Sequence, residues 1–162
     1  MRAWYPASVT LFMTLSACGG GTLQQGATPR LRQPDVSQSM VGRWALVSLV
    51  RNGEDMTDRM RSAGVVSYYT FDADGTFRIV RGDSITETGT WSEDTTVSPK
   101  LFDHIPHVNG KTGPYVPGIF AIAGDTLTIS LIGPNPERRH PTQFRSVLAD
   151  HSWLLVYRRA PQ

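Results

Sequence analysis

Short apolar or alternating runs, separated by turn residues, cover the chain from position 41 to 159 and determine which fold class it can adopt. The turns between the runs carry Gly, Asp, Asn and Pro, as at Gly124-Asp125, and most have the length of a hairpin connection. The pattern therefore predicts an all-β domain with antiparallel pairing of consecutive strands. Eight strands are expected, at 41–50, 67–71, 76–81, 85–91, 100–105, 115–123, 126–132 and 153–159.

The order of these strands predicts how the sheet is arranged. Sequential hairpins without a long crossover favour an up-and-down antiparallel meander, and eight such strands close into a barrel whose interior fits side chains or one small ligand. Closure also removes the edges that an exported β-protein would otherwise expose. An open sandwich is the competing architecture. The charged segment 55–62, with Met56 and Met60 at i,i+4 spacing, is expected to form a short helix or lid after the first strand.

The N-terminus is typical of an export signal. A single Arg2 precedes an apolar stretch at 7–15, which is too short to span a membrane because a spanning helix needs ~20 apolar residues. Leu15-Ser16-Ala17-Cys18 and the glycines at 19–21 follow. This arrangement resembles the lipobox of bacterial lipoproteins, and the resemblance implies cleavage before Cys18 and a diacylglycerol on its thiol. An ordinary secretory signal is the alternative that remains open.

This interpretation divides the chain into three parts. Residues 1–17 are the expected signal peptide, and residues 18–40 are the lipidated Cys18 with a flexible tether of Gly, Gln, Thr, Ser and Pro. Residues 41–162 are the expected barrel, which has one hydrophobic core. The predicted location is the outer membrane, lipid-anchored and facing the periplasm, or the cell membrane in a host with a single membrane. The bilayer, reached through acylated Cys18, is thus a predicted partner.

Charge and cysteine content narrow the partners further. The chain has 16 Lys and Arg against 14 Asp and Glu, and the signal peptide carries one of the cations. The mature chain is close to neutral, so no nucleic-acid partner is expected. Cys18 is the single cysteine, so a lipidated chain has no thiol left for a disulfide or a nucleophile. We expect a monomer.

Gly42-x-Trp44 in the first strand, together with Arg158 and Arg159 in the last, resembles the lipocalin signature. The resemblance implies that Gly42 opens the first strand and that an arginine of the last strand stacks on Trp44 to close the barrel base. Arg158 is assigned to this role. A stacked cation of this kind contributes about 0.5–2 kcal/mol.

Four motifs in the second half of the chain carry a further resemblance. They are Pro99-Lys100 with Asp103, Gly118-Ile119-Phe120 with Ile122, Gly124-Asp125-Thr126-Leu127, and Pro141-Thr142-x-Phe144. Their order is similar to that of an uncharacterised family of bacterial lipocalin-like exported proteins, over positions 42–159. His140 stands where that family tends to have arginine, and Phe120 where tyrosine is common. The resemblance implies a calycin-like barrel without an assigned activity.

Catalytic and metal-binding motifs are sparse. Asp103, His104 and His107 place one acid and two imidazoles within five positions, and on an extended strand the two histidines point to opposite faces. A zinc site would need a third ligand from elsewhere. The sequence has no Gly-x-Ser-x-Gly elbow, His-Glu-x-x-His helix or phosphate loop. We therefore assign no catalytic residue, metal or cofactor and do not expect an enzyme, while the role of His104 and His107 stays open.

Aromatic residues on the predicted strands suggest what the barrel holds. Core filling is their default role, and some are expected to line a site for a small apolar or amphipathic ligand. An alternative is a protein-interaction or inhibitor module that uses the loops 55–62, 106–114 and 133–144, and an enzyme built on the Asp103 region is a third hypothesis. The residues expected to line the ligand site are Tyr68, Phe77, Trp91, Phe120 and Tyr157.

Overall fold

A computed structural model describes residues 39–64, 66–133, 137 and 139–161. The predicted signal peptide, Cys18 and nearly all of the tether lie outside the described residues. The barrel belongs to a compact unit that spans Pro34–Gln162. Among the described residues, no helix has the length and apolar character needed to cross a bilayer.

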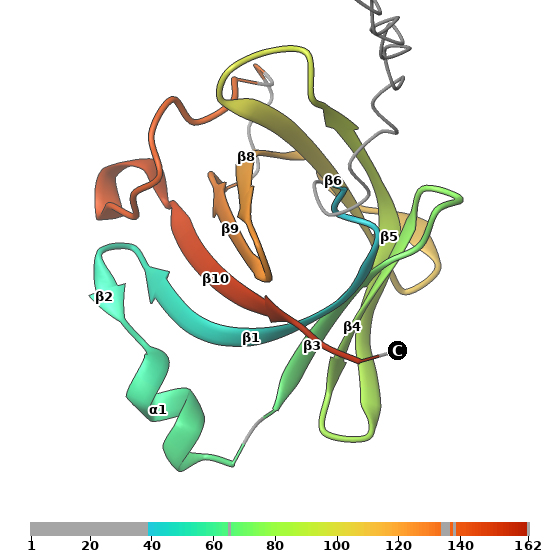
Figure 1. Ribbon diagram of the computed structural model, residues 1–162, viewed down its shortest axis with the longest axis vertical. Coiled ribbons are helices and arrows are strands. Elements are labelled where there is room, and N and C mark those ends of the chain that lie inside the picture. The colour runs from blue at the N-terminus through green and yellow to red at the C-terminus, as the bar shows by residue number, and fades with distance from the viewer. Residues whose placement is uncertain (1–38, 65, 134–136, 138, 162) are drawn as a thin grey trace, which may run out of the picture. The chain divides into compact units, whose positions relative to one another are not determined.

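Eight long strands form one closed antiparallel barrel (Figure 1), which confirms the predicted fold class. They pair in the order β10-β9-β8-β6-β5-β4-β3-β1, and β10 pairs with β1 to complete the circle. The long strands are β1 (Gly42–Arg51), β3 (Ser67–Phe71), β4 (Thr76–Arg81), β5 (Ser84–Asp94), β6 (Lys100–Val108), β8 (Val116–Ala123), β9 (Thr126–Leu131) and β10 (Trp153–Arg159). The short elements are β2 (Glu54–Asp55), α1 (Thr57–Ser62), β7 (Lys111–Thr112) and the 3-10 helix η2 (Leu148–Asp150).

Strands β5 and β6 run further than the sequence predicts. Their ladder extends from Thr88 paired with His107 to Asp94 paired with Leu101, beyond the expected strand ends at Trp91 and Ile105. Polar residues continue a strand when a neighbouring strand supplies its backbone hydrogen bonds, although the apolar alternation has ended. Strands β3, β4 and β10 have the predicted bounds.

A β-bulge in β1 explains why this strand is apolar on both parities. Its register with β10 shifts between Leu46 and Ser48, so that Leu46 pairs with Tyr157 while Leu49 pairs with Leu155. A bulge inserts one extra residue and reverses which parity faces the interior. Both Leu46 and Leu49 therefore pack against the core.

Helix α1 is attached at this bulge. The backbone N–H of Leu49 donates to Thr57 Oγ1 at 3.2 Å, and Arg61 Nη2 donates to the carbonyl of Val47 at 3.4 Å. Thr57 is buried at the start of the helix, which lies outside the barrel wall beside β1 and β2 (Figure 1). The segment expected to be a helix or lid is thus a short helix held by hydrogen bonds to the bulged strand.

Aromatic side chains fill much of the barrel interior. Tyr69 stacks on Phe71 with ring centroids 4.2 Å apart, and Phe71 meets Phe102 edge to face at 5.6 Å. Such pairs stabilise a core beyond the area they bury. The largest fully buried side chains are Trp44, Phe71, Phe77, Phe102, Phe120, Met40, Ile119, Leu127 and Ile129.

The two ends of the barrel differ. At the end where β1 begins, which we call the closed end, Trp44 is fully buried and its Nε1 donates to the carbonyl of Met40 at 2.7 Å. At the opposite end, which we call the mouth, β1 ends at Arg51 opposite Trp153. Antiparallel order places the connections β1–β3, β4–β5, β6–β8 and β9–β10 at the mouth. The segments expected to act as interaction loops therefore gather there.

Candidate functional site

The closed end contains the residues expected to close the barrel, with one correction. The Arg159 guanidinium carbon lies 4.1 Å from the centroid of the Trp44 ring, whereas Arg158, to which this role was assigned, is exposed. Gly42 has φ +130°, and a Cβ there would lie 3.1 Å from Arg159 Nη1. The cation that stacks on Trp44 is thus the second of the two arginines, because Trp44 pairs with Arg159 in the β1–β10 register.

The aromatic residues expected to line a ligand site separate into inward and outward positions. Phe77 and Phe120 are 2% and 1% exposed and are part of the packed core. Trp91 packs on Phe71 near the closed end, where its Nε1 donates to the carbonyl of Asp72 at 3.2 Å. Tyr68 faces the outside, with the Arg43 guanidinium 3.8 Å from its ring, so its assignment to the lining is wrong. The inward tyrosine of β3 is Tyr69.

Polar side chains enter the interior between the aromatic core and the mouth. We call Tyr69, Glu87, His104 and Tyr157 the polar layer. His104 is 6% exposed, and its Nε2 lies 3.0 Å from Glu87 Oε1. Its ring meets Phe77 at a centroid distance of 4.4 Å and Tyr69 at 6.0 Å, while Tyr69 lies 6.1 Å from Tyr157. Four strands thus contribute to one buried layer.

Two atoms of the polar layer are buried without a hydrogen-bond partner among the described residues. They are the hydroxyl of Tyr69 and Nδ1 of His104. An ionised carboxylate only accepts hydrogen bonds, so Glu87 assigns the proton of a neutral His104 to Nε2 and leaves Nδ1 as an acceptor. Buried polar atoms are nearly always paired with protein or water, so both positions require a partner that the described residues do not supply.

Burial keeps both tyrosines of the layer protonated. Desolvation is the largest cause that raises the pKa of Tyr69, and the neighbouring Tyr157 and Glu87 raise it further. Desolvation also raises the pKa of Tyr157, against the opposing effect of the Arg81 cation. At neutral pH both phenols are therefore hydrogen-bond donors.

Half-buried apolar side chains lie beside this layer and between it and the mouth. Each lies on the inward parity of its strand, yet all are half-buried and remain in contact with solvent. The Glu87 side chain is 34% exposed, so solvent also reaches one member of the polar layer. The apolar residues of the mouth are Leu49, Ile79, Val116 and Trp153.

The alternation in β3 could have identified the tyrosine of the polar layer, although the sequence prediction chose Tyr68 in place of Tyr69. In β3, alternation divides Ser67, Tyr69 and Phe71 from Tyr68 and Thr70, and the first set is buried. Glu87 and His104 carry no such signal, because they lie 17 positions apart and become neighbours when β5 pairs with β6.

The Asp103, His104 and His107 cluster is divided by the barrel wall. His104 points inward, while Asp103 and His107 lie on the outer parity of β6, as the opposite directions of the two histidines predict. Asp103 Oδ1 instead meets His140 Nε2 at 2.7 Å and accepts from the Tyr115 hydroxyl at 2.5 Å. Its partners are therefore distant in sequence. In the part of the chain that the structure describes, no group of three or more His, Cys, Asp and Glu is placed to hold a metal ion.

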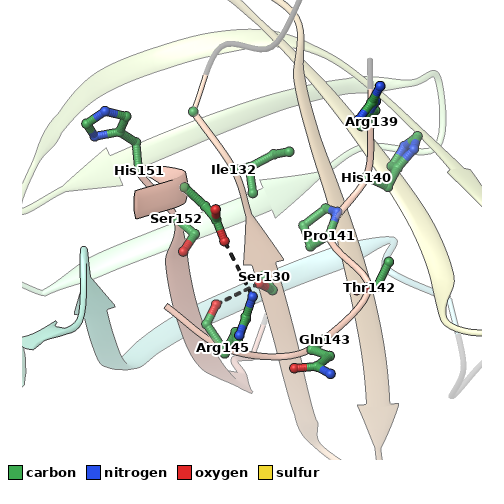
Figure 2. A pocket seen from close by; sticks show the side chains of 12 residues that line it. Ser130, Ile132, Arg139, His140, Pro141, Thr142, Gln143, Arg145, His151 and Ser152 are labelled. Atoms are coloured by element: carbon green, nitrogen blue, oxygen red, sulfur yellow. Dashed lines mark hydrogen bonds and ion pairs between the residues drawn. The ribbon is translucent and has the colours of Figure 1, made fainter. Parts of the chain in front are cut away.

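A concavity lies outside the barrel wall (Figure 2). Its volume is about 470 Å³, and its lining includes Ser130, His140, Arg145 and Ser152. The Ser130 hydroxyl donates to the carbonyl of Arg145 at 3.1 Å, and Arg145 Nη2 lies 3.7 Å from Asp150 Oδ2. These contacts hold the segment between β9 and β10 against the outer face of β9, because Ser130 has the parity opposite to inward Ile129 and Leu131.

The fold and the site together define an eight-stranded, closed antiparallel barrel with a buried aromatic core and a polar layer below its mouth. Comparison of the chain with protein-family models, with curated proteins and with solved structures finds no significant match. The eight-stranded antiparallel barrel that the lipocalin-like resemblance implies is confirmed, and membership of the family stays a prediction.

Proposed function

We propose that this protein is an exported, lipid-anchored barrel of the lipocalin-like type that binds a small amphipathic molecule at its mouth. The observation that carries the proposal is the set of half-buried apolar side chains at the mouth, together with two buried polar atoms of the polar layer that have no partner among the described residues. Apolar surface with a few convergent polar groups is the usual composition of a small-molecule site. The sequence motifs shared with the lipocalin signature support the same function.

The aromatic core limits the size and depth of the ligand. Phe71, Phe77 and Phe102 are at most 2% exposed and occupy the barrel below the polar layer. A ligand therefore binds near the mouth, with its polar end inward and its apolar body against Ile79 and Trp153. A long molecule that reaches the closed end would have to displace packed rings, at a cost of several kcal/mol.

Native mass spectrometry tests this proposal. Residues 19–162, which keep the whole barrel unit, are purified from the natural host without detergent. We expect a bound molecule of small mass, and we expect Ile79→Gln to reduce its occupancy by removing apolar contact at the mouth. Val80→Gln is the matched control, because Val80 has the opposite parity on the same strand. Consistent absence of a bound molecule, or an equal loss in both variants, would argue against a carrier.

The membrane anchor is a separate part of the proposal. We expect acylation of Cys18, with the barrel facing the periplasm from the outer membrane, or facing outward from the cell membrane of a host with one membrane. Cells fed an alkyne-labelled palmitate should yield labelled protein in the membrane fraction, and Cys18→Ser should abolish the label. Because Cys18 is the single cysteine, a label that persists in this variant would contradict the anchor.

A protein-interaction module is the second candidate. The long connections gather at the mouth, and one of them exposes Leu148 to 66% and Phe144 to 38%. A partner that docks on this connection would lose affinity on Leu148→Asp while ligand occupancy stays the same. The reverse result, lower ligand occupancy with unchanged affinity for the partner, would assign the function to the mouth.

A further inference from the structure

We propose that the ligand is a neutral apolar alcohol, whose hydroxyl donates to His104 Nδ1 and accepts from the Tyr69 hydroxyl. This inference rests on the proposed function and names the chemical class of molecule that the same site takes. The two protein atoms that point to it are buried and lack a hydrogen-bond partner among the described residues.

The His104 side requires a donor. Its Nε2 is engaged 3.0 Å from Glu87 Oε1, which leaves Nδ1 as a buried acceptor without a donor among the described residues. The ring cannot turn over to avoid this requirement without losing the Glu87 contact. It is enclosed by Phe77 and Phe102, with centroid distances of 4.4 Å and 6.1 Å. A ligand at this position must therefore supply an N–H or O–H group.

The Tyr69 side supplies a second contact to the same ligand group, as a hydrogen-bond donor. Burial holds the phenol in its protonated form, so its hydroxyl offers one donor. Its ring lies 6.0 Å from that of His104 at an interplanar angle of 68°. A hydroxyl group satisfies both requirements at once, because it carries one donor and two acceptor lone pairs.

The hydrogen-bond requirements of the layer, together with burial, oppose an ionised ligand. A carboxylate would approach the Glu87 carboxylate, which lies beside His104, and its ionised form has no proton to donate to Nδ1. An ammonium would have no acceptor for the Tyr69 proton, and it would approach Arg81, whose cation lowers the pKa of Tyr157. Either ion also loses hydration when it is buried. A neutral hydroxyl avoids both penalties.

A water molecule has the same donors and acceptors and is the competing occupant. An alcohol differs because its carbon body also covers the half-buried side chains of Leu49, Ile79, Val116 and Trp153. Removing apolar surface from water is favourable in proportion to the area that is buried. The alcohol is therefore favoured over water wherever its body fits the mouth.

Four probes of one shape test the inference by NMR titration of residues 19–162. They are benzyl alcohol, toluene, benzoate and benzylamine. Two hydrogen bonds of ordinary strength predict that benzyl alcohol binds at least ~10-fold more tightly than toluene, and more tightly than both ions at neutral pH. Addition of the alcohol should also shift the ¹⁵N signal of the unprotonated His104 nitrogen, which a ligand held by apolar contact alone would leave in place.

Variants of the two neighbouring tyrosines of β3 test whether the preference for the alcohol arises at the polar layer. Tyr69→Phe should lower the affinity for benzyl alcohol about 5- to 10-fold and leave the affinity for toluene unchanged. Tyr68→Phe, on the outer face of the same strand, should change neither. If Tyr69→Phe does not fold, the probe preference and the His104 nitrogen signal of the natural sequence decide the question.

The outcomes separate the inference from the proposed function. Equal binding of benzyl alcohol and toluene would overturn hydroxyl recognition and leave an apolar carrier in place. Tighter binding of benzoate or benzylamine would overturn the neutral ligand. Binding of none of the four probes would indicate a site filled by water alone and would contradict both proposals.

Discussion

Neighbouring residues of similar chemistry have opposite environments across the barrel wall. Tyr69 is buried in the polar layer while Tyr68 lies outside under Arg43, and Arg159 stacks on Trp44 while Arg158 is exposed. Because side chains alternate between the two faces of a strand, a shift by one position changes every contact of a residue. In each such pair, substitution of the outward residue is a matched control for substitution of the inward one.

Arg159 and Arg158 form one such pair for stability. Arg159→Leu removes the cation above Trp44 and the hydrogen bonds to the carbonyls of Val41 and Ser39. We expect it to lower the free energy of unfolding by about 1–2 kcal/mol. Arg158→Leu should change it by less than about 0.5 kcal/mol. Urea denaturation followed by tryptophan fluorescence measures both, and equal effects would contradict the stacking role.

Glu93 predicts a dependence of stability on pH. Burial raises its pKa, against the smaller opposing effects of the Met40 N–H and Lys100, and its Oε2 is buried without a partner among the described residues. The folded state thus holds the proton more tightly than the unfolded chain. This contribution to stability is present below the ordinary carboxyl pKa of about 4.3 and is lost as the pH rises through the raised value.

Glu93→Gln tests this pH dependence. We expect the variant to gain stability over the natural sequence at pH 7 and to gain less at pH 4, because glutamine has no proton to lose. Thermal unfolding at the two pH values measures the difference. Glu54→Gln is the control, since Glu54 is exposed in β2. A difference that does not change with pH would show that Glu93 is not held in its protonated form.

Among the elements, helix α1 depends for its position on the β-bulge in the neighbouring strand β1. The bulge in β1 turns the Leu49 N–H toward the Thr57 hydroxyl, which also donates to Ser48 Oγ at 3.2 Å. A helix of six residues has little stability of its own. Its position therefore depends on contacts of this kind with β1.

Thr57→Val tests how α1 is held. The change keeps the shape of the side chain and removes its hydroxyl, so the Leu49 N–H loses its partner, at an expected cost of about 1–3 kcal/mol. Amide hydrogen exchange should accelerate at Met60 and Ala63 of the helix more than in β8 or β9. Thr57→Ser should restore slow exchange. Uniform acceleration across the barrel would contradict a local role.

At the scale of the whole molecule, the pairing of β1 with β10 closes the barrel. Seven residue pairs join the two strands, from Trp44 with Arg159 to Arg51 with Trp153. The partners are more than 100 positions apart in sequence, so we expect this ladder to form late in folding, because closing so large a loop costs conformational entropy. Without it, β1 and β10 would each present an unpaired edge.

Deletion of residues 153–162 tests the closure. We expect the shortened chain to be unfolded or aggregated, because the deletion removes Leu155 and Tyr157 from the core and exposes two strand edges. Deletion of residues 161–162 alone should leave the barrel intact, since the last pairing contact is that of Ala160 N–H with the carbonyl of Arg43. Circular dichroism and size-exclusion chromatography distinguish the two outcomes. A soluble, folded product from the longer deletion would contradict closure by β10.

The fold was largely predictable from local pattern, since alternation and turn residues specify strands and their order within short windows. The candidate site was predictable in part. Phe77 and Tyr157 have inward positions, as expected, and Tyr68 was off by one residue. To choose between Tyr68 and Tyr69, one must know which face of β3 is turned toward the core. The pairing with the neighbouring strands determines that face.

The sequence by itself determined an eight-stranded antiparallel meander, the turns between its strands, and an N-terminus typical of a lipid anchor. The tertiary structure alone decided that Glu87 meets His104, that Asp103 pairs with His140 and that Arg159 is the arginine above Trp44. The physical reason is the sequence range of the signals, because turn residues and apolar alternation specify structure within a few positions. A contact between distant strands depends on the register and bulges of the closed barrel, which have no local signature in the chain.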